Sequence, residues 1–157
     1  MHAAWGYHLL VNCTAGKAER FTEENIKTFI TNLIRDIDMV AYGEPMITKF
    51  AELSIDKAGY SFCQMIETSN ITGHFVDSNG NFYIDIFSCK TFEPEAAISL
   101  INAHFEPTRV SSRMLGRNAS EAPHQMFSLE SWSESDPKTL PDTGDGWAFG
   151  YSPYIKC

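Results

Sequence analysis

Apolar residues recur every three or four positions in two segments, which is the period of an amphipathic helix. The first segment follows Thr22, a typical N-cap residue, and its first turn contains the acidic residues Glu23 and Glu24. The second begins near Glu93-Pro94 and is stopped by Pro107, because proline is favoured in a first turn and excluded from a helix interior. The first helix is expected to bury Ile26, Phe29, Ile30, Leu33, Ile34 and Ile37.

Six other runs are short and rich in β-branched and aromatic residues, which favours strands. They cover residues 5–13, 46–53, 59–66, 71–76, 82–87 and 108–115. Gly43-Glu44-Pro45 is expected to end the first helical region, and Asn79-Gly80 to form a hairpin turn. The order β-α-β-β-β-β-α-β predicts an α/β protein of the α+β type. We expect a two-layer sandwich with two helices on one face of a mainly antiparallel sheet.

The pattern changes from Gly116 onward, where serine, proline, glycine and aspartate are frequent and no period persists. Aromatic and other apolar residues continue to occur there, which is unusual for a disordered tail. We therefore expect a domain over 1–115 and a C-terminal extension over 116–157 that packs as an extended arm on the domain or a partner subunit. The residues on which this depends are Met126, Phe127, Trp132, Trp147, Phe149, Tyr151 and Tyr154.

Composition narrows the class of protein. The chain has 157 residues, 43% of them hydrophobic, which suits one globular domain. A formal net charge of −8 argues against a nucleic-acid partner. The longest apolar runs fall short of the roughly 18 residues that span a bilayer, and the first residues lack a signal-peptide pattern. These features predict a cytoplasmic protein with no membrane partner. Cys13, Cys63, Cys89 and Cys157 are scattered without a CxxC pair, so we expect reduced thiols and no metal site.

The most informative chemistry is a serine, a histidine and a cysteine. Ser69 precedes His74 by five residues and Cys89 by twenty. A hairpin over this region is expected to bring the three side chains to one end of a sheet. Alone, each residue has an ordinary structural explanation: a turn serine, a half-buried strand histidine and a small core cysteine. Together they also suggest an acyl-transfer nucleophile with a base, although the glycine-flanked elbow of an esterase is missing.

From about residue 6 to residue 115 the sequence resembles the prokaryotic S-adenosylmethionine decarboxylases, the pyruvoyl-dependent enzymes of spermidine synthesis. The matching segments are Gly6-Tyr7-His8-Leu9, Ser69-x4-His74 and Asp85-Ile86-Phe87-Ser88-Cys89, together with Ser61 eight residues before Ser69. Several matches at fixed spacing are more specific than one short motif.

The resemblance implies an inactive precursor that cleaves itself between Thr68 and Ser69. Ser69 would attack the carbonyl of Thr68 and become a covalent pyruvoyl group, with His74 as proton acceptor and Ser61 assisting. The pyruvoyl ketone forms a Schiff base with a substrate amino group and draws off electrons as CO2 leaves. Cys89 would then return a proton to the substrate. The family also implies a homodimer of processed protomers, with no metal and no external cofactor.

Two departures from the family bear on the substrate. Thr68 stands where a glutamate is common, and attack on either carbonyl is chemically equivalent. Phe75-Val76-Asp77-Ser78 replaces a Thr-Trp-Pro-Glu segment whose acid binds ribose, so Asp77 is the candidate to replace that acid from one residue earlier. Ornithine or arginine is the alternative substrate, and an unprocessed, non-catalytic homologue is the third hypothesis. Phe50, Phe62 and Phe75 are candidates for adenine stacking, with core packing as the competing role.

Overall fold

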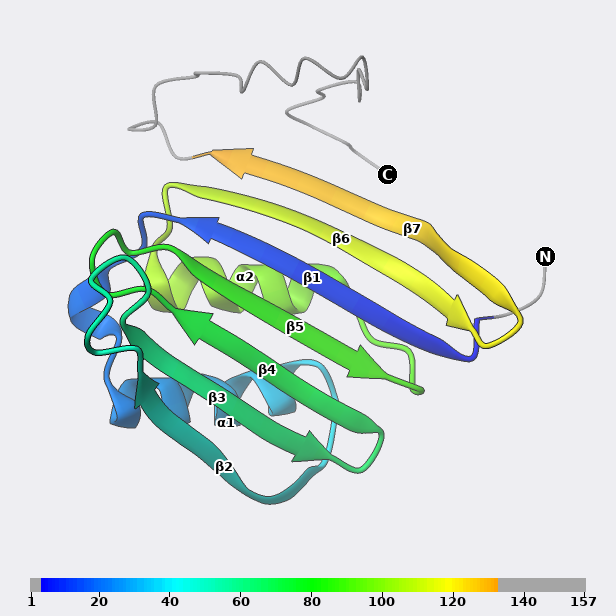
Figure 1. The fold of residues 1–157 in the computed structure, drawn as a ribbon. Coiled ribbons are helices and arrows are strands. Elements are labelled where there is room, and N and C mark those ends of the chain that lie inside the picture. The colour runs from blue at the N-terminus through cyan, green and yellow to red at the C-terminus, as the bar shows by residue number, and fades with distance from the viewer. Residues whose placement is uncertain (1–3, 133–157) are drawn as a thin grey trace.

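The structure is a computed structural model that describes residues 4–132. An antiparallel sheet of seven strands is covered on one face by two helices (Figure 1). The strands are β1 (Gly6–Thr14), β2 (Ala41–Phe50), β3 (Gly59–Ile66), β4 (Ser69–Phe75), β5 (Phe82–Ser88), β6 (Arg109–Asn118) and β7 (Glu121–Trp132), and their order across the sheet is β2-β3-β4-β5-β1-β6-β7. The helices are α1 (Glu23–Asp36) and α2 (Pro94–Phe105), with a 3-10 turn, η1 (Ala18–Arg20), before α1. The predicted two-layer α+β sandwich is confirmed.

Both helices begin where the sequence indicates, and α2 also ends as expected, just before Pro107. Thr22 is the N-cap of α1, and its side chain accepts a hydrogen bond from the backbone N–H of Asn25 at 3.2 Å. Pro94 occupies the first turn of α2, which ends at Glu106 in the left-handed conformation, with φ of 47°. All six apolar residues expected on the inner face of α1 and its C-cap are buried.

The core lies between the helices and the inner face of the sheet. Phe75, Phe82 and Phe105 are fully buried and pack against one another with ring centroids 5.0 to 5.4 Å apart. Burying one such side chain stabilises the fold by about 1.5–3 kcal/mol. Phe62 is also buried, so Phe62 and Phe75 take the core role rather than that of adenine-stacking residues. Phe50 is half exposed at the end of β2.

Gly43-Glu44-Pro45 does not separate the first helix from the second strand, as the sequence suggested. These residues lie inside β2, whose pairing with β3 shifts register between Tyr42 and Met46. Gly43 has φ of 68°, a conformation that glycine adopts without strain. A bulge at an edge strand accommodates both the glycine and the proline, because the edge needs no partner for the missing proline N–H.

The C-terminal region contributes a seventh strand. β6 continues past Leu115 to Asn118, and β7 pairs with it through residues 121–132. The expected boundary at 115 therefore falls within a strand, and residues 121–132 of the extension pair with the edge of the sheet. Phe127 and Leu129 pack against the core, which gives β7 a partly buried face. The rest of the predicted arm, 133–157, lies outside the described residues.

The second face of the sheet carries no helix (Figure 1). Strand alternation places one set of side chains on this face, which we call the open face. Several of them are apolar and exposed: Leu10, Tyr42, Met46, Met65 and Tyr83. None of the helices between residues 4 and 132 is long and apolar enough to cross a membrane.

Candidate active site

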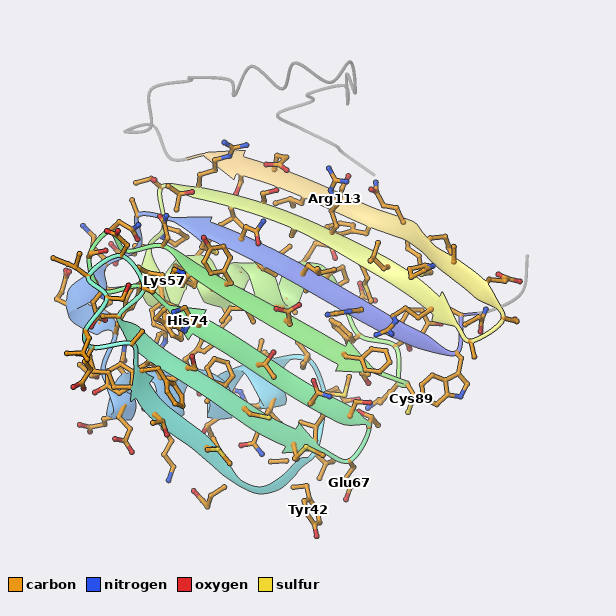
Figure 2. The ribbon with its side chains drawn as sticks, viewed as in Figure 1. Tyr42, Lys57, Glu67, His74, Cys89 and Arg113 are labelled. Atoms are coloured by element: carbon orange, nitrogen blue, oxygen red, sulfur yellow. The ribbon has the colours of Figure 1, made fainter. Side chains whose placement is uncertain are left out.

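The functional residues expected from the sequence fall into two groups at opposite ends of β4. Ser69 pairs with Ile66 and Ser88 at the start of the strand, whereas His74 pairs with Ser61 and Tyr83 near its end. Figure 2 shows His74 beside Lys57 at one end of the sheet, and Cys89 and Glu67 at the other. We call the first group the histidine end and the second the serine end.

Five residues of extended chain span about 16 Å, because a strand rises about 3.3 Å per residue. An odd spacing also places the two positions on opposite faces of a strand. The expectation that a hairpin gathers Ser69, His74 and Cys89 at one end of the sheet is therefore wrong within one protomer. The hairpin brings together Ser69 and Cys89 and separates both of them from His74.

At the serine end, the peptide bond between Thr68 and Ser69 is held by the residue after β5. The backbone N–H of Cys89 donates a hydrogen bond to the carbonyl oxygen of Thr68 at 3.1 Å. Such a donor draws electron density from the carbonyl and stabilises negative charge that develops on its oxygen. The Cys89 thiol belongs to an exposed residue. One residue thus offers a donor to the carbonyl and a thiol at the surface.

Ser69 has an unusual backbone. Its φ is 150°, a value that residues with a side chain rarely adopt and that favours glycine. A serine held there stores strain of about 1–3 kcal/mol, which a rearrangement of this backbone could release. The strain lies next to the carbonyl that accepts the Cys89 hydrogen bond, so the two features act on the same peptide bond.

The side chain of Thr68 is fixed as well. Its hydroxyl accepts a hydrogen bond from Ser88 Oγ at 2.9 Å and donates one to Met39 Sδ at 3.2 Å. Ser88 is fully buried and Met39 is buried where the α1 to β2 connection ends. The residue on the carbonyl side of Ser69 is therefore anchored through both its main chain and its side chain.

At the histidine end, Ser61 and His74 form a close polar pair. The distance from Ser61 Oγ to His74 Nδ1 is 2.6 Å, and His74 Nε2 lies 3.3 Å from the backbone oxygen of Lys57. A carbonyl only accepts, so the neutral ring carries its proton on Nε2 and uses Nδ1 as the acceptor. Ser61 then donates to Nδ1, and His74 is oriented as a base.

Asp77 follows β4 on the side of the histidine end. Its carboxylate forms an ion pair with Lys49 at 2.9 Å, and both side chains are partly exposed. The pair raises the pKa of Lys49, through the hydrogen bond first and the charge second. Asp77 thus lies at the same end of the sheet as His74, and its carboxylate is already paired with a lysine.

Sequence reasoning missed two polar contacts. His8 Nε2 lies 3.0 Å from Asp85 Oδ1 between β1 and β5, and both residues belong to segments that carried the resemblance. The other contact is the hydrogen bond from the buried hydroxyl of Ser88 to Thr68. Ser88 is part of the matching motif, but the sequence analysis gave it no role. Alternation alone predicts that His8 and Asp85 share a face with His74, since they face away from the buried positions next to them.

The two other cysteines between residues 4 and 132 show no sign of a reactive site. Cys13 is buried in β1, and that burial raises the pKa of its thiol far above the usual range. Cys63 is exposed on β3. Among residues 4–132 there is no group of three or more histidine, cysteine, aspartate or glutamate side chains placed to hold a metal ion.

Fold and site together define an α+β sandwich with a strained serine beside a polarised carbonyl and a separate serine–histidine pair. The model of the S-adenosylmethionine decarboxylase family matches residues 7–118, and the chain belongs to this family. The matched region contains both ends described above and stops where β6 ends. The family resemblance seen in the sequence is confirmed, and with it the general assignment to S-adenosylmethionine decarboxylation.

A solved structure shares the fold. The adenosylmethionine decarboxylase from Aquifex aeolicus VF5 superposes with a TM-score of 0.63 at 17% sequence identity, covering 76% of this chain and 96% of the other. At this identity the likeness concerns the fold alone. No curated protein matches the chain.

Proposed function

We propose that the chain cleaves itself between Thr68 and Ser69 and then decarboxylates S-adenosylmethionine with a pyruvoyl group derived from Ser69. The observation that carries the proposal is the strained Ser69 backbone beside a carbonyl that accepts the Cys89 N–H at 3.1 Å. The Ser69 nucleophile, its strained backbone and the Cys89 N–H lie together where β4 begins and β5 ends. These groups supply the nucleophile, the strain and the oxyanion stabilisation of an intramolecular acyl shift, which further needs a base.

The self-cleavage can be written as a balanced reaction. Ser69 Oγ attacks the Thr68 carbonyl carbon, the C–N bond breaks, and the peptide becomes an ester with a free amine on residue 69. Loss of the Ser69 α-proton then breaks the Cβ–O bond, which leaves Thr68 as a carboxylic acid and residue 69 as an enamine. Tautomerisation and hydrolysis by one water release ammonia and leave the pyruvoyl ketone. Each cleavage thus consumes one water and releases one ammonia.

The pyruvoyl group would supply a ketone that takes up the electron pair released when the substrate carboxylate leaves as CO2. The chain's own contribution is to place a proton donor nearby. Cys89 is exposed and directly follows Ser88, which pairs with residue 69 across β4 and β5. Its thiol is therefore suited to return a proton to the substrate carbon.

We further propose that His74 and Ser61 act on the Ser69 of a second copy. Within one protomer the two ends are about 16 Å apart by strand geometry. A two-fold axis between two open faces, running across the strands, reverses strand direction and places the histidine end of one copy over the β3–β4 turn of the other, where the Thr68–Ser69 bond joins the turn to β4. The exposed apolar side chains of the open face favour burial against such a partner.

The same arrangement gives Asp77 a place in the substrate site. Asp77 lies at the histidine end, so a second copy would bring it to Cys89 and residue 69 together with His74. We propose that it contacts the ribose hydroxyls of the substrate, with Lys49 orienting the carboxylate through their ion pair. The product would serve spermidine synthesis, the role implied by the family.

Mass spectrometry of the purified chain tests the proposal directly. We expect two fragments, residues 1–68 and 69–157, the second with an N-terminal pyruvoyl group. Borohydride reduction in the presence of S-adenosylmethionine should add a substrate-derived mass to that fragment. Ser69→Ala is the control and should stay as one chain. An intact wild-type chain without a reducible carbonyl would contradict the proposal and support a non-catalytic homologue.

Substrate choice is measured separately by CO2 release. S-adenosylmethionine should be decarboxylated, whereas ornithine and arginine should not. Release from either basic amino acid, with none from S-adenosylmethionine, would keep the self-cleavage chemistry and replace the substrate.

A further inference from the structure

Ser88 is a buried polar residue that the proposed chemistry leaves without a role. It is fully buried and pairs directly with Ser69 between β4 and β5. A buried hydroxyl needs hydrogen bonds within the protein, because an unpaired polar group in the core destabilises the fold. The partners of this hydroxyl therefore show what it holds in place.

The Ser88 hydroxyl is one link in a directed chain of hydrogen bonds. The backbone N–H of Lys90 donates to Ser88 Oγ at 3.0 Å, and Ser88 Oγ donates to Thr68 Oγ1 at 2.9 Å. Thr68 Oγ1 in turn donates to Met39 Sδ at 3.2 Å. Ser88 Oγ also lies 3.7 Å from Met39 Sδ, but its single proton has the closer and stronger acceptor in Thr68. Each hydroxyl gives one proton and receives one, so neither is free to rotate.

Thr68 is consequently held at two atoms by consecutive residues. Ser88 holds its side-chain oxygen, and the Cys89 N–H holds its carbonyl oxygen. A single hydrogen bond to the carbonyl would let the peptide plane swing about that contact, whereas two anchors fix its orientation. Intramolecular attack depends steeply on such orientation, because a misdirected carbonyl lowers the fraction of time spent in reactive geometry.

We infer that Ser88 is a positioning residue for self-cleavage: its hydroxyl fixes Thr68 so that the carbonyl stays on the Cys89 N–H and in reach of Ser69. The inference rests on the proposed self-cleavage and deepens it. The hydroxyl of Ser88 bonds to the Thr68 side chain and the Lys90 N–H and to none of the atoms that react, so it acts on the rate at which the precursor is processed. It has no part in the turnover of substrate by chains that are already cleaved.

The test is the time course of cleavage in full-length chains made by cell-free translation. Ser88→Ala should slow cleavage about tenfold, the factor that corresponds to one buried hydrogen bond. CO2 release per cleaved chain should stay at the wild-type value. Ser112→Ala is the matched control, since Ser112 is also buried but lies on β6, where its hydroxyl donates to the Leu129 carbonyl at 3.3 Å. This control should cleave at the wild-type rate.

Two more variants separate positioning from general structure. Ser88→Thr keeps the hydroxyl and should restore most of the rate. Thr68→Val removes the acceptor with little change of shape and should slow cleavage by a similar factor. The double variant of Ser88→Ala with Thr68→Val should be no slower than either single variant, because both break the same link.

The outcomes are distinguishable. The inference is overturned if the Ser88→Ala chain cleaves at the wild-type rate, or if Ser112→Ala slows cleavage as much as Ser88→Ala does. Either result leaves the proposed function intact. If Ser88→Ala does not fold, Thr68→Val decides alone, and cleavage at the wild-type rate overturns the inference. A wild-type chain that never cleaves overturns the proposed function and this inference together.

Discussion

The two ends of β4 carry different kinds of chemistry. At the serine end the important groups belong to the main chain: the strained φ of Ser69, the Thr68 carbonyl and the Cys89 N–H. At the histidine end they are side chains, with Ser61 bonded to His74 at 2.6 Å. The serine end has a peptide bond with a strained neighbour and a hydrogen-bonded carbonyl, and the histidine end has an imidazole that can act as a base. Within one protomer, neither end has both groups.

This contrast predicts which substitutions separate the two proposed reactions. Groups of the main chain survive side-chain substitution, so self-cleavage should tolerate changes at Cys89. Side-chain groups are lost on substitution, so changes at the histidine end should slow self-cleavage. Four experiments test the contrast, in order of the size of effect expected.

The largest effect is expected from Cys89→Ala on decarboxylation. Removing the proton donor should lower kcat by about 10³-fold, within the range of general acid catalysis. Cleavage between Thr68 and Ser69 should persist, because alanine keeps the backbone N–H. The two readouts are CO2 release and fragment mass, and Cys63→Ala, which removes another exposed thiol, is the control. The opposite result would be loss of cleavage while the few cleaved chains still decarboxylate at the wild-type rate. It would show that the Cys89 side chain serves cleavage and not decarboxylation.

His74→Ala should slow self-cleavage by about 10²-fold, because the base is lost. Co-expression with Ser69→Ala should then restore cleavage of the His74→Ala chain, since the Ser69→Ala partner supplies an intact histidine end. Differently tagged chains allow each to be followed on one gel. If co-expression restores nothing, the two ends do not meet between copies, and the comparison drawn above fails.

Met65→Glu tests the open face as the surface between copies. A charge on an apolar interface should weaken self-association by at least about tenfold, as measured by analytical ultracentrifugation, and cleavage should slow with it. Leu53→Glu is the matched control, because Leu53 is also exposed but lies in the loop between β2 and β3. An unchanged sedimentation profile for Met65→Glu would place the interface elsewhere.

Ser61→Ala should give the smallest effect. It removes the donor to Nδ1 but leaves His74 anchored to the Lys57 carbonyl, so cleavage should slow by about fivefold to tenfold. Ser61→Thr keeps the hydroxyl and should recover much of this loss. Complete loss of cleavage in Ser61→Ala would show that Ser61 transfers the proton itself.

Much of the fold was predictable because local patterns dominate it. The Thr22 cap, the period of α1 and the turn at Asn79-Gly80 are short-range signals, and each element stands where they indicate. Two regions were not predictable in this way. Taken alone, Gly43-Glu44-Pro45 predicts the end of a secondary-structure element. It forms a bulge because the residues before it and the residues after it both pair with β3. Residues 121–132 show no clean alternation and become a strand because β6 offers a free edge.

The sequence by itself determined which residues can react. It also contained the odd spacing between Ser69 and His74, which already places them on opposite faces of one strand. Only the tertiary structure decided which neighbours each of them meets. Antiparallel pairing puts Ser69 beside Ser88, and it puts Ser61 beside His74 at the other end. The physical reason is that these features depend on how strands pair. Spacing along the chain carries no direct information about the hydrogen-bond register, the backbone strain or the buried hydroxyl that result from this pairing.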